Sequence, residues 1–410
     1  MIIIGILFFI FGFVTWLNGS LIPFLKVICE LSDFEALFVT FAFYIAYTVM
    51  AFPMAAILER VGYKRGMVLG LGVMAFGSLL FIPAALSATF GIFLVALFIL
   101  GTGLTLLQTA SNPYIVLLGP IESAAMRISI MGLINKSAGV FAPLLFSAVV
   151  FSGLGSAESL SVDERDSIAA ALVVPYIVMA LSLAALAIFV NFSSLKELAF
   201  ERVEEGSESI FKNPRVVLGA VALFFYVGIE VIAGDTIGLY AQTLEIPNAT
   251  ALTSYTMVFM VLSYLVGVFF IPRIISQKTA LILSATLGVV FLLGVAFSST
   301  TERGFSEFLW GWSGIMTLPN SITFVALLGF ANALVWPTIW PLALEDLGAQ
   351  TPKASALLIM AIAGGALLPL LFGKIALMSG MQMAYLFGIL CYGVILFYAL
   401  KGHTMKEWRL

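Results

Sequence analysis

The stretch LGTGLTLLQTASNPYIVLLG, residues 100–119, decides how this chain is organised, because it has a counterpart in LGFANALVWPTIWPLALEDLG, residues 328–348. A second pair, GVFAPLLFS (139–147) and GALLPLLFG (365–373), is separated by nearly the same distance. The two offsets are 228 and 226 residues, and the prolines correspond within each pair, Pro113 with Pro341 and Pro143 with Pro369. A repeat at one fixed offset predicts two halves built on the same plan.

The composition places these halves in a membrane. Hydrophobic residues make up 62% of the 410 residues, charged residues 10%, and the mean hydropathy is +1.13, whereas soluble proteins carry about 45–50% apolar and about 25% charged residues. A spanning helix needs about 20 apolar residues. The apolar runs predict an all-α membrane protein with twelve spans at 2–25, 34–58, 66–86, 90–118, 126–152, 167–193, 214–242, 250–272, 278–298, 319–344, 354–376 and 381–400.

The longest polar stretch, LKELAFERVEEGSESIFKNPR (195–215), lies at mid-chain and separates six spans from six. We therefore expect four parts. They are an N-terminal six-helix bundle (1–193), a cytoplasmic linker (194–213), a C-terminal six-helix bundle (214–400) and a cytoplasmic tail (401–410).

Lys and Arg residues set the expected orientation. Fourteen of the 19 fall in one set of connections together with the tail, and three in the other set, so the positive-inside rule predicts that both termini are cytoplasmic. The opening run MIIIGILFFIFGFVTWL has neither a basic start nor a cleavage site, so we interpret it as a span and not a signal peptide; a short native leader is expected to be missing. The net charge of −3 and the lack of a basic tract give no indication of nucleic-acid binding.

Ionisable residues inside spans are costly and therefore point to function. The spans contain Lys136, Glu230 and Asp235, and Lys374 near an end. Glu230 and Asp235 subtend about 140° on a regular helix, but nearby glycines could bend it and free carbonyl oxygens. With Thr236, they form a candidate Na⁺ site, since hard cations prefer oxygen ligands. A proton carried by a buried carboxylate and a structural pair with Lys136 are the alternatives.

Buried amides are the second group of candidates. Gln108 and Asn112 share one helix face at i, i+4 spacing, and amides offer paired donors and acceptors that suit a neutral hydroxylated solute such as a sugar. Tryptophan and tyrosine side chains could stack on a sugar ring; the alternative is helix–helix packing. The predicted substrate-binding residues are Asn18, Gln108, Asn112, Asn135, Lys136, Tyr226, Asn332 and Trp336.

The connection AAILERVGYKRGMVLG (55–70) resembles a degraded form of the loop motif of the major facilitator superfamily. Its matching residues are Glu59, Arg60, Gly62, Lys64 and Arg65, and alanine stands where the motif begins with glycine. A basic loop of this kind fixes topology and can pair with helix ends, which suggests a gating role; positive-inside charge alone is the simpler interpretation.

Four further motifs resemble the fucose permease and glucose/galactose transporter branch of that superfamily. They are FFxxGxxxxLNxxLIP (8–23), TASNP (109–113), GPIESAAMRI (119–128) and YVGIE (226–230). The resemblance implies the major facilitator fold, two parallel six-helix repeats, and sugar import by alternating access driven by an ion gradient.

The same resemblance implies where coupling can and cannot lie. In proton-coupled fucose members an Asp and a Glu carry the proton, and the aligned positions here are Gly19 and Gln108, which cannot titrate. The family's asparagine in the fifth helix corresponds to Asn135. Glu230 and Asp235 thus become the leading coupling residues, and Na⁺-dependent members of the glucose/galactose branch favour Na⁺ over H⁺.

The sequence therefore predicts a Na⁺-coupled symporter for a glucose- or galactose-like hexose in the bacterial inner membrane, bound at mid-membrane between the halves. We expect a monomer with no cofactor and no enzymatic activity, since the single histidine, His403, lies in the tail. The alternatives are an H⁺-coupled sugar symporter, a drug/H⁺ antiporter and a membrane sensor.

Overall fold

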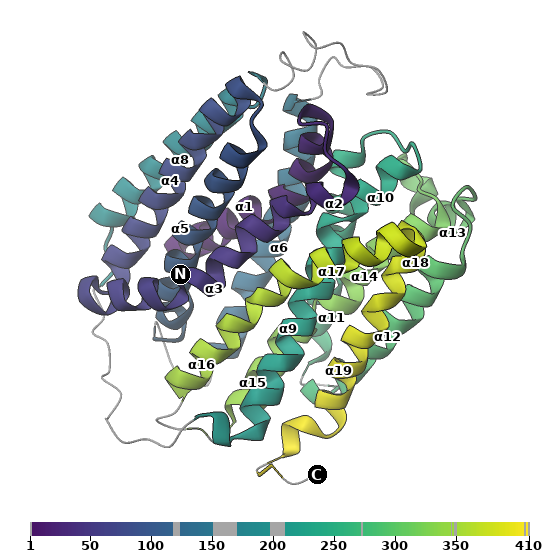
Figure 1. Ribbon diagram of the computed structural model, residues 1–410. Coiled ribbons are helices and arrows are strands. Elements are labelled where there is room, and N and C mark those ends of the chain that lie inside the picture. The colour runs from purple at the N-terminus through teal and green to yellow at the C-terminus, as the bar shows by residue number, and fades with distance from the viewer. Residues whose placement is uncertain are drawn as a thin grey trace. The chain divides into compact units, whose positions relative to one another are not determined.

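The computed structural model describes residues 2–117, 124–150, 170–196, 210–271, 274–345, 347, 351–405 and 407–408, and the regular structure in these ranges is helical throughout. The chain divides into two compact units, Met1–Arg202 and Val203–Leu410. In Figure 1 the first unit runs from purple to blue-green and the second from teal to yellow. Each unit is described by itself below.

Twelve helical segments in these ranges are long and apolar enough to cross a membrane, which confirms the predicted number of spans. They are Ile2–Ile28, Asp33–Ala51, Tyr63–Ser87, Phe90–Asn112, Ile130–Ala148, Val173–Phe192, Pro214–Asp235, Ala249–Phe270, Gln277–Phe297, Asn320–Leu344, Leu357–Ser379 and Met381–Thr404. The GPIES sequence (119–123), most of the predicted linker (197–209 of 194–213) and tail residues 406, 409 and 410 lie outside the described residues.

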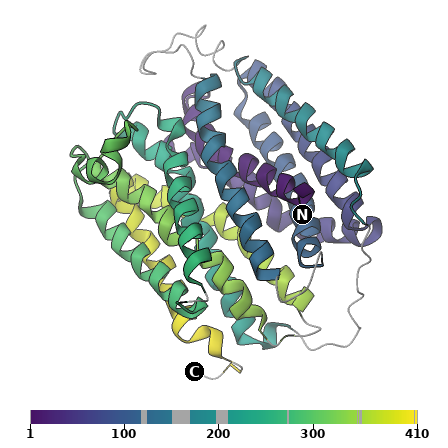
Figure 2. The same cartoon turned by 180° about the vertical axis from the view of Figure 1, so that it is seen from behind.

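In its described residues, the first unit has one short helix and six long ones. Its helices are α1 (Ile2–Ile28), α2 (Asp33–Ala36), α3 (Phe38–Val61), α4 (Tyr63–Ser87), α5 (Phe90–Leu117), α6 (Ala124–Val150) and α8 (Val173–Phe192). α5 packs against α4 and α3, α1 packs against α6, and α4 packs against α8. Figures 1 and 2 show the long helices of this unit side by side.

The second unit repeats this packing scheme. Its helices are α9 (Pro214–Asp235), α10 (Ile237–Thr243), α11 (Thr253–Phe270), α12 (Gln277–Phe297), α13 (Gly304–Trp310), α14 (Asn320–Asn332), α15 (Val335–Leu344), α16 (Thr351–Met360), α17 (Gly364–Ser379), α18 (Met381–Ala384) and α19 (Gly388–Leu400). Here α14 packs against α12 and α11, α9 against α17, and α12 against α19. In each unit the fourth span thus contacts the third and second, the first contacts the fifth, and the third contacts the sixth. The predicted pair of six-helix repeats is confirmed.

Small residues let the first and fifth spans of each unit approach closely, as is usual between helices in membranes. A Cβ placed on Gly12 of α1 would lie 1.8 Å from the Asn135 carbonyl oxygen of α6. In the second unit the glycine is on the other partner, because a Cβ on Gly364 of α17 would lie 1.8 Å from the Phe224 carbonyl oxygen of α9. Neither pair of helices could be this close with any larger residue.

Several spans expected to be continuous are interrupted, and two of these interruptions lie beside predicted site residues. The helix predicted over 214–242 ends as α9 at Asp235, bends at Thr236 and resumes as α10. The helix predicted over 319–344 breaks between α14 and α15, at Ala333–Leu334. Apolar composition does not report such breaks, because a broken span is as hydrophobic as a regular one.

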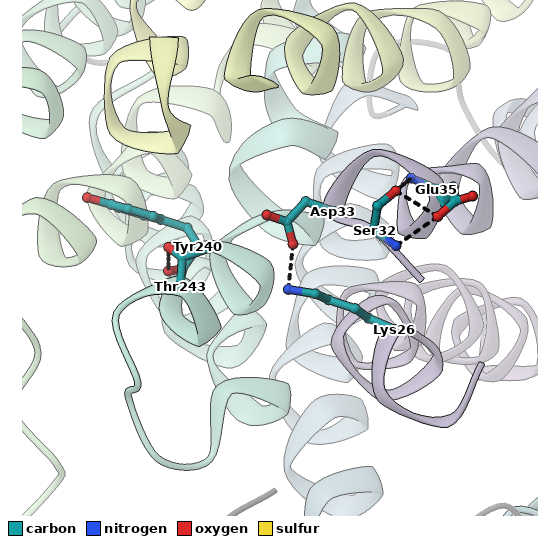
Figure 3. Close-up of polar contacts among 6 residues, drawn as sticks. All are labelled: Lys26, Ser32, Asp33, Glu35, Tyr240 and Thr243. Atoms are coloured by element: carbon teal, nitrogen blue, oxygen red, sulfur yellow. Dashed lines mark hydrogen bonds and ion pairs between the residues drawn. The ribbon is translucent and has the colours of Figure 1, made fainter. Parts of the chain in front are cut away.

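A compact polar junction joins α1 to α2 (Figure 3). Lys26 Nζ, in the last turn of α1, lies 2.5 Å from Asp33 Oδ1. Ser32 begins α2 with a capping box, in which its Oγ accepts from the Glu35 amide and the Glu35 carboxylate accepts from the Ser32 amide. This arrangement satisfies the exposed amides of α2 and orients the start of the second span.

Candidate functional site

A polar cluster in the second unit surrounds Glu230. Because Tyr226 precedes Glu230 by four residues, both lie on one face of α9, and the Tyr226 hydroxyl donates to Glu230 Oε1 at 2.7 Å. Glu230 is only 7% exposed. Tyr264 of α11 and Tyr392 of α19 lie within electrostatic range of its carboxylate. The buried carboxylate is therefore bonded by a tyrosine of its own helix, and tyrosines of two further membrane helices lie near it.

Asn332 belongs to the same cluster. It ends α14, and its Oδ1 accepts a 2.7 Å hydrogen bond from the Tyr392 hydroxyl. Its Nδ2 is buried and makes no hydrogen bond within the described residues. We call Tyr226, Glu230, Tyr264, Asn332 and Tyr392 the carboxylate–tyrosine cluster.

An aromatic surface borders this cluster. The ring of Tyr226 lies 6.3 Å from that of Trp336, and the ring of Trp336 lies 5.5 Å from that of Trp340. Both tryptophans lie on α15, just after the break that follows Asn332. The break thus lets one span contribute an amide from α14 and an aromatic pair from α15, and the structure brings the predicted residues Tyr226, Asn332 and Trp336 into one unit's polar cluster and its border.

The break after α9 has hydroxyl partners. Thr253 Oγ1 donates to the Gly234 carbonyl at 2.8 Å, and Thr256 Oγ1 donates to the Ala233 carbonyl at 3.3 Å. Thr236 Oγ1 donates to the Ile232 carbonyl at 2.7 Å and lies 2.8 Å from the Tyr385 hydroxyl. The carbonyls at the bend, which we expected to be free for a cation, thus each accept a threonine hydroxyl, from α11 or from the bend itself.

Asp235 is fully buried at the end of α9. Since both carboxylates belong to the same regular helix, their five-residue spacing directs them about 140° apart. Glu230 is held by Tyr226, whereas Asp235 lies beside the bend. Within the described residues, no group of three or more His, Cys, Asp and Glu side chains is arranged to hold a metal ion.

In the first unit, predicted residues make contacts between neighbouring helices. Gln108 Nε2 of α5 donates to the Tyr47 hydroxyl of α3 at 2.9 Å. The ammonium group of Lys136, on α6, lies 4.4 Å from the ring centre of Trp16, on α1, a cation–π distance. Lys136 is buried, and its contact with Trp16 joins α6 to α1.

The remaining predicted residues of this unit lie along the same helices. Asn135 Nδ2 donates to the Phe8 carbonyl of α1 at 3.3 Å. Asn18 is 1% exposed, and its Nδ2 makes no hydrogen bond within the described residues. Asn112 is half-buried, one turn after Gln108. Gln108 thus joins α5 to α3, whereas Asn135 and Lys136 both join α6 to α1.

The basic connection 55–70 contacts a helix end. Lys64 Nζ donates to the Ser193 carbonyl at 2.8 Å, and Ser193 is the C-cap residue that follows α8. Arg60 and Arg65 are exposed, and the side chain of Glu59 lies outside the described residues. Cations near a helix C-terminus are favourable because the terminal carbonyls carry partial negative charge.

Sequence reasoning missed the partner hydroxyls. Tyr47, Tyr264, Tyr385 and Tyr392 were not identified as candidates, although each lies in a span and contacts or faces a polar residue. One signal was readable, since Tyr226 and Glu230 share a helix face at i, i+4. The other partners come from helices distant in sequence and leave no such spacing.

Comparisons with known proteins agree with this architecture. The family model described as Major Facilitator Superfamily matches residues 4–368. A glucose/galactose transporter from Brucella abortus biovar 1 (strain 9-941) is 35% identical over 97% of this chain and 92% of its own length. A putative glucose/galactose transporter from Helicobacter pylori (strain J99) is 34% identical over 98% of this chain and 96% of its own.

More distant relatives lie in the fucose branch. The L-fucose-proton symporter of Escherichia coli (strain K12) is 28% identical over 96% of this chain and 90% of its own. The crystal structure of FucP, a major facilitator transporter in the outward conformation, superimposes with a TM-score of 0.72 at 23% identity and covers 97% of both chains. The predicted major facilitator fold is confirmed. With its two matching six-helix units and these relatives over nearly its whole length, the chain belongs to the Major Facilitator Superfamily.

Proposed function

We propose that this protein imports a hexose of the glucose or galactose type, driven by symport with a cation, in the bacterial inner membrane. The names of relatives 34–35% identical over nearly the whole chain support the substrate class. The observation that carries the coupling is Glu230, a carboxylate buried within membrane helices and bonded by Tyr226 at 2.7 Å. Burying such a group in a membrane costs free energy, and the residues that do so usually have a function.

Each unit has its own proposed substrate ligands. In the first unit the proposed ligands are Asn18, Gln108, Asn112, Asn135 and Lys136. In the second unit they are Tyr226, Asn332 and Trp336. The Nδ2 atoms of Asn18 and Asn332 support this assignment, since each is a buried donor that makes no hydrogen bond within the described residues. A sugar hydroxyl would satisfy it, and leaving it unsatisfied costs roughly 1–3 kcal/mol. Trp336 offers an apolar face for the sugar ring.

We assign the coupling cation to Glu230, with Asp235 and Thr236 at the neighbouring bend. The resemblance to the glucose/galactose branch favours Na⁺. The bend favours a proton, because Ile232, Ala233 and Gly234 carbonyls accept from threonine hydroxyls and a Na⁺ ion would need several such oxygens. A single carboxylate bonded by a tyrosine is sufficient to carry a proton. A proton at Glu230 is therefore the cation that the geometry favours.

Proteoliposomes separate these possibilities. Labelled glucose uptake is measured under an imposed Na⁺ gradient and, separately, an imposed H⁺ gradient. We expect accumulation with one gradient, and Glu230→Gln should abolish it while sugar exchange continues. Glu345→Gln, which removes an ion pair with Arg215, is the matched carboxylate control and should accumulate sugar. Full active uptake by Glu230→Gln would exclude Glu230 from coupling, and the absence of sugar transport under any gradient would exclude the substrate class.

We further propose that both termini and the segment 194–213 are cytoplasmic. The excess of Lys and Arg on one set of connections supports this orientation. Cysteine labelling of Lys401→Cys with an impermeant maleimide tests it in a background without Cys29 and Cys391. Labelling in inverted vesicles and protection in intact cells is the expected result.

A further inference from the structure

The connection between α12 and α14, residues 298–319, is a folded hairpin, which we call the aromatic hairpin. The Asn320 amide donates to the Glu302 carbonyl at 2.8 Å, and the Ser321 amide donates to the Ser299 carbonyl at 3.1 Å. Ser306, in α13, donates to the Leu318 carbonyl at 2.7 Å. The hairpin is therefore fastened to the start of α14 by both backbone and side chains.

Large apolar side chains on this hairpin point outward. Phe308 is 81% exposed and Trp312 is 84% exposed, and Ile315 is also exposed. Trp310 lies differently, since its ring packs 5.7 Å from Tyr255 and 6.0 Å from Phe259 of α11. A loop that packs one half-buried tryptophan against α11 thus presents a second tryptophan and a phenylalanine away from the protein.

The ends of the hairpin fix where these side chains lie relative to a bilayer. Phe297 ends one span and Asn320 begins the next, so the hairpin connects two membrane crossings on the same side. The exposed apolar surface continues into the crossing that precedes the hairpin, since Phe297 and Val290 of α12 are exposed as well. The polar members Glu302, Arg303 and Glu307 are exposed on the same hairpin.

The composition of the hairpin matches the boundary between lipid and water. Tryptophan and other amphipathic aromatics are enriched at the headgroup level, where an apolar ring meets polar groups. The Trp312 indole NH donates to the Leu309 carbonyl at 3.2 Å, so its polar group is satisfied and its ring can enter an apolar region. Charged residues stay in water, as in an interfacial segment.

We propose that the aromatic hairpin is an interfacial membrane anchor in which Phe308 and Trp312 insert into the headgroup region of the bilayer. The occupant of this exposed surface is lipid, because the hairpin follows directly on α12, whose Val290 and Phe297 are exposed, and because both of its ends adjoin membrane crossings. The anchor sets the depth of α14, the helix that carries Asn332. This inference rests on the membrane fold and is independent of the transported solute.

The test uses the full-length protein in nanodiscs of phosphatidylcholine and phosphatidylglycerol. In a Cys29→Ser, Cys391→Ser background, Phe308→Cys and Trp312→Cys are each spin-labelled, and collision with oxygen and with a water-soluble nickel chelate is measured. Val290→Cys is the reference in the lipid-facing part of a span, and Thr301→Cys is the reference in water. We expect both hairpin labels to fall between the references, with oxygen accessibility several-fold above that of Thr301→Cys.

Nickel accessibility equal to that of Thr301→Cys would overturn the proposal. Protection from both reagents together with spin–spin broadening would also overturn it, because that result would indicate contact with a second copy of the chain. A measurement without cysteine replacement uses the native tryptophan. Lipids with a nitroxide near the headgroup should quench the wild-type emission more than that of Trp312→Phe. Equal quenching of the two proteins would contradict the anchor even if a labelled variant failed to fold.

Discussion

Gly101 and Gly329, 228 positions apart in the chain, hold equivalent places in the two units. A Cβ on Gly101 would lie 2.3 Å from the Phe43 carbonyl oxygen, and a Cβ on Gly329 would lie 2.1 Å from that of Thr256. In each unit the fourth span thus meets the backbone of the second at a glycine. The offset equals that of the repeated stretches 100–119 and 328–348. The internal repeat in the sequence therefore corresponds to a helix crossing that occurs in both units.

Replacing either of these glycines should destabilise the protein. Gly101→Ala and Gly329→Ala each place a methyl group against a backbone oxygen that cannot rotate away, and overpacking of this kind costs roughly 1–3 kcal/mol. Gly72→Ala on α4 and Gly393→Ala on α19 are matched controls, since nothing lies within 4 Å of either Cβ. Thermal unfolding of the purified protein in detergent measures the difference. Equal midpoints for the crossing and control variants would contradict the close approach.

Tyr226→Phe should weaken ion-driven uptake. It removes the 2.7 Å donor to Glu230, and hydrogen bonds to charged groups contribute about 1.5–3 kcal/mol, so gradient-driven accumulation should fall by about tenfold or more. Tyr240→Phe is the control, because its hydroxyl donates to Ser321 and not to a carboxylate. Initial rates of uptake and exchange in proteoliposomes provide the comparison. An equal loss in both variants would mean that Tyr226 acts only in packing.

Asn18→Leu should separate stability from transport. The buried Nδ2 of Asn18 makes no hydrogen bond within the described residues, so an apolar side chain of similar size should leave the unfolding midpoint unchanged or raise it. If Asn18 contacts the sugar, KM should rise by about tenfold or more. Gln382→Leu is the opposite case, because its amide donates to the Val295 and Ser298 carbonyls and its loss should lower stability while KM is retained. A normal KM in Asn18→Leu would remove Asn18 from the substrate site.

Lys64→Met should loosen the end of α8. The lost contact is a charged donor on the Ser193 carbonyl at 2.8 Å, and we expect a loss of about 1 kcal/mol in stability. Arg65→Met, at an exposed neighbouring position, should change stability by less than about 0.5 kcal/mol. Protease sensitivity near residue 193 and thermal unfolding measure the effect. If the two variants behave alike, the connection 55–70 acts through its charge and not through this contact.

The seventh span, α9 and α10, illustrates how much of the structure could be predicted from the sequence. The pair Tyr226 and Glu230 was readable, because i, i+4 spacing places both on one face whatever surrounds the helix. The break at Thr236 was suggested by nearby glycines, but its threonine partners were not. Thr253 and Thr256 belong to α11, the next span. Only the packing of α11 against α9 aligns their hydroxyls with the Gly234 and Ala233 carbonyls.

The sequence by itself determined the twelve spans, the repeat and the few polar residues within apolar segments, because hydropathy and spacing are local properties that sum along each segment. Only the tertiary structure decided that Gln108 bonds to Tyr47, that Lys136 lies over Trp16 and that Asn332 accepts from Tyr392. Each of these contacts joins different helices, so it depends on their rotation and axial register. That register is set by the close crossings at residues such as Gly12 and Gly329, where backbone shape and not hydrophobicity selects the neighbour.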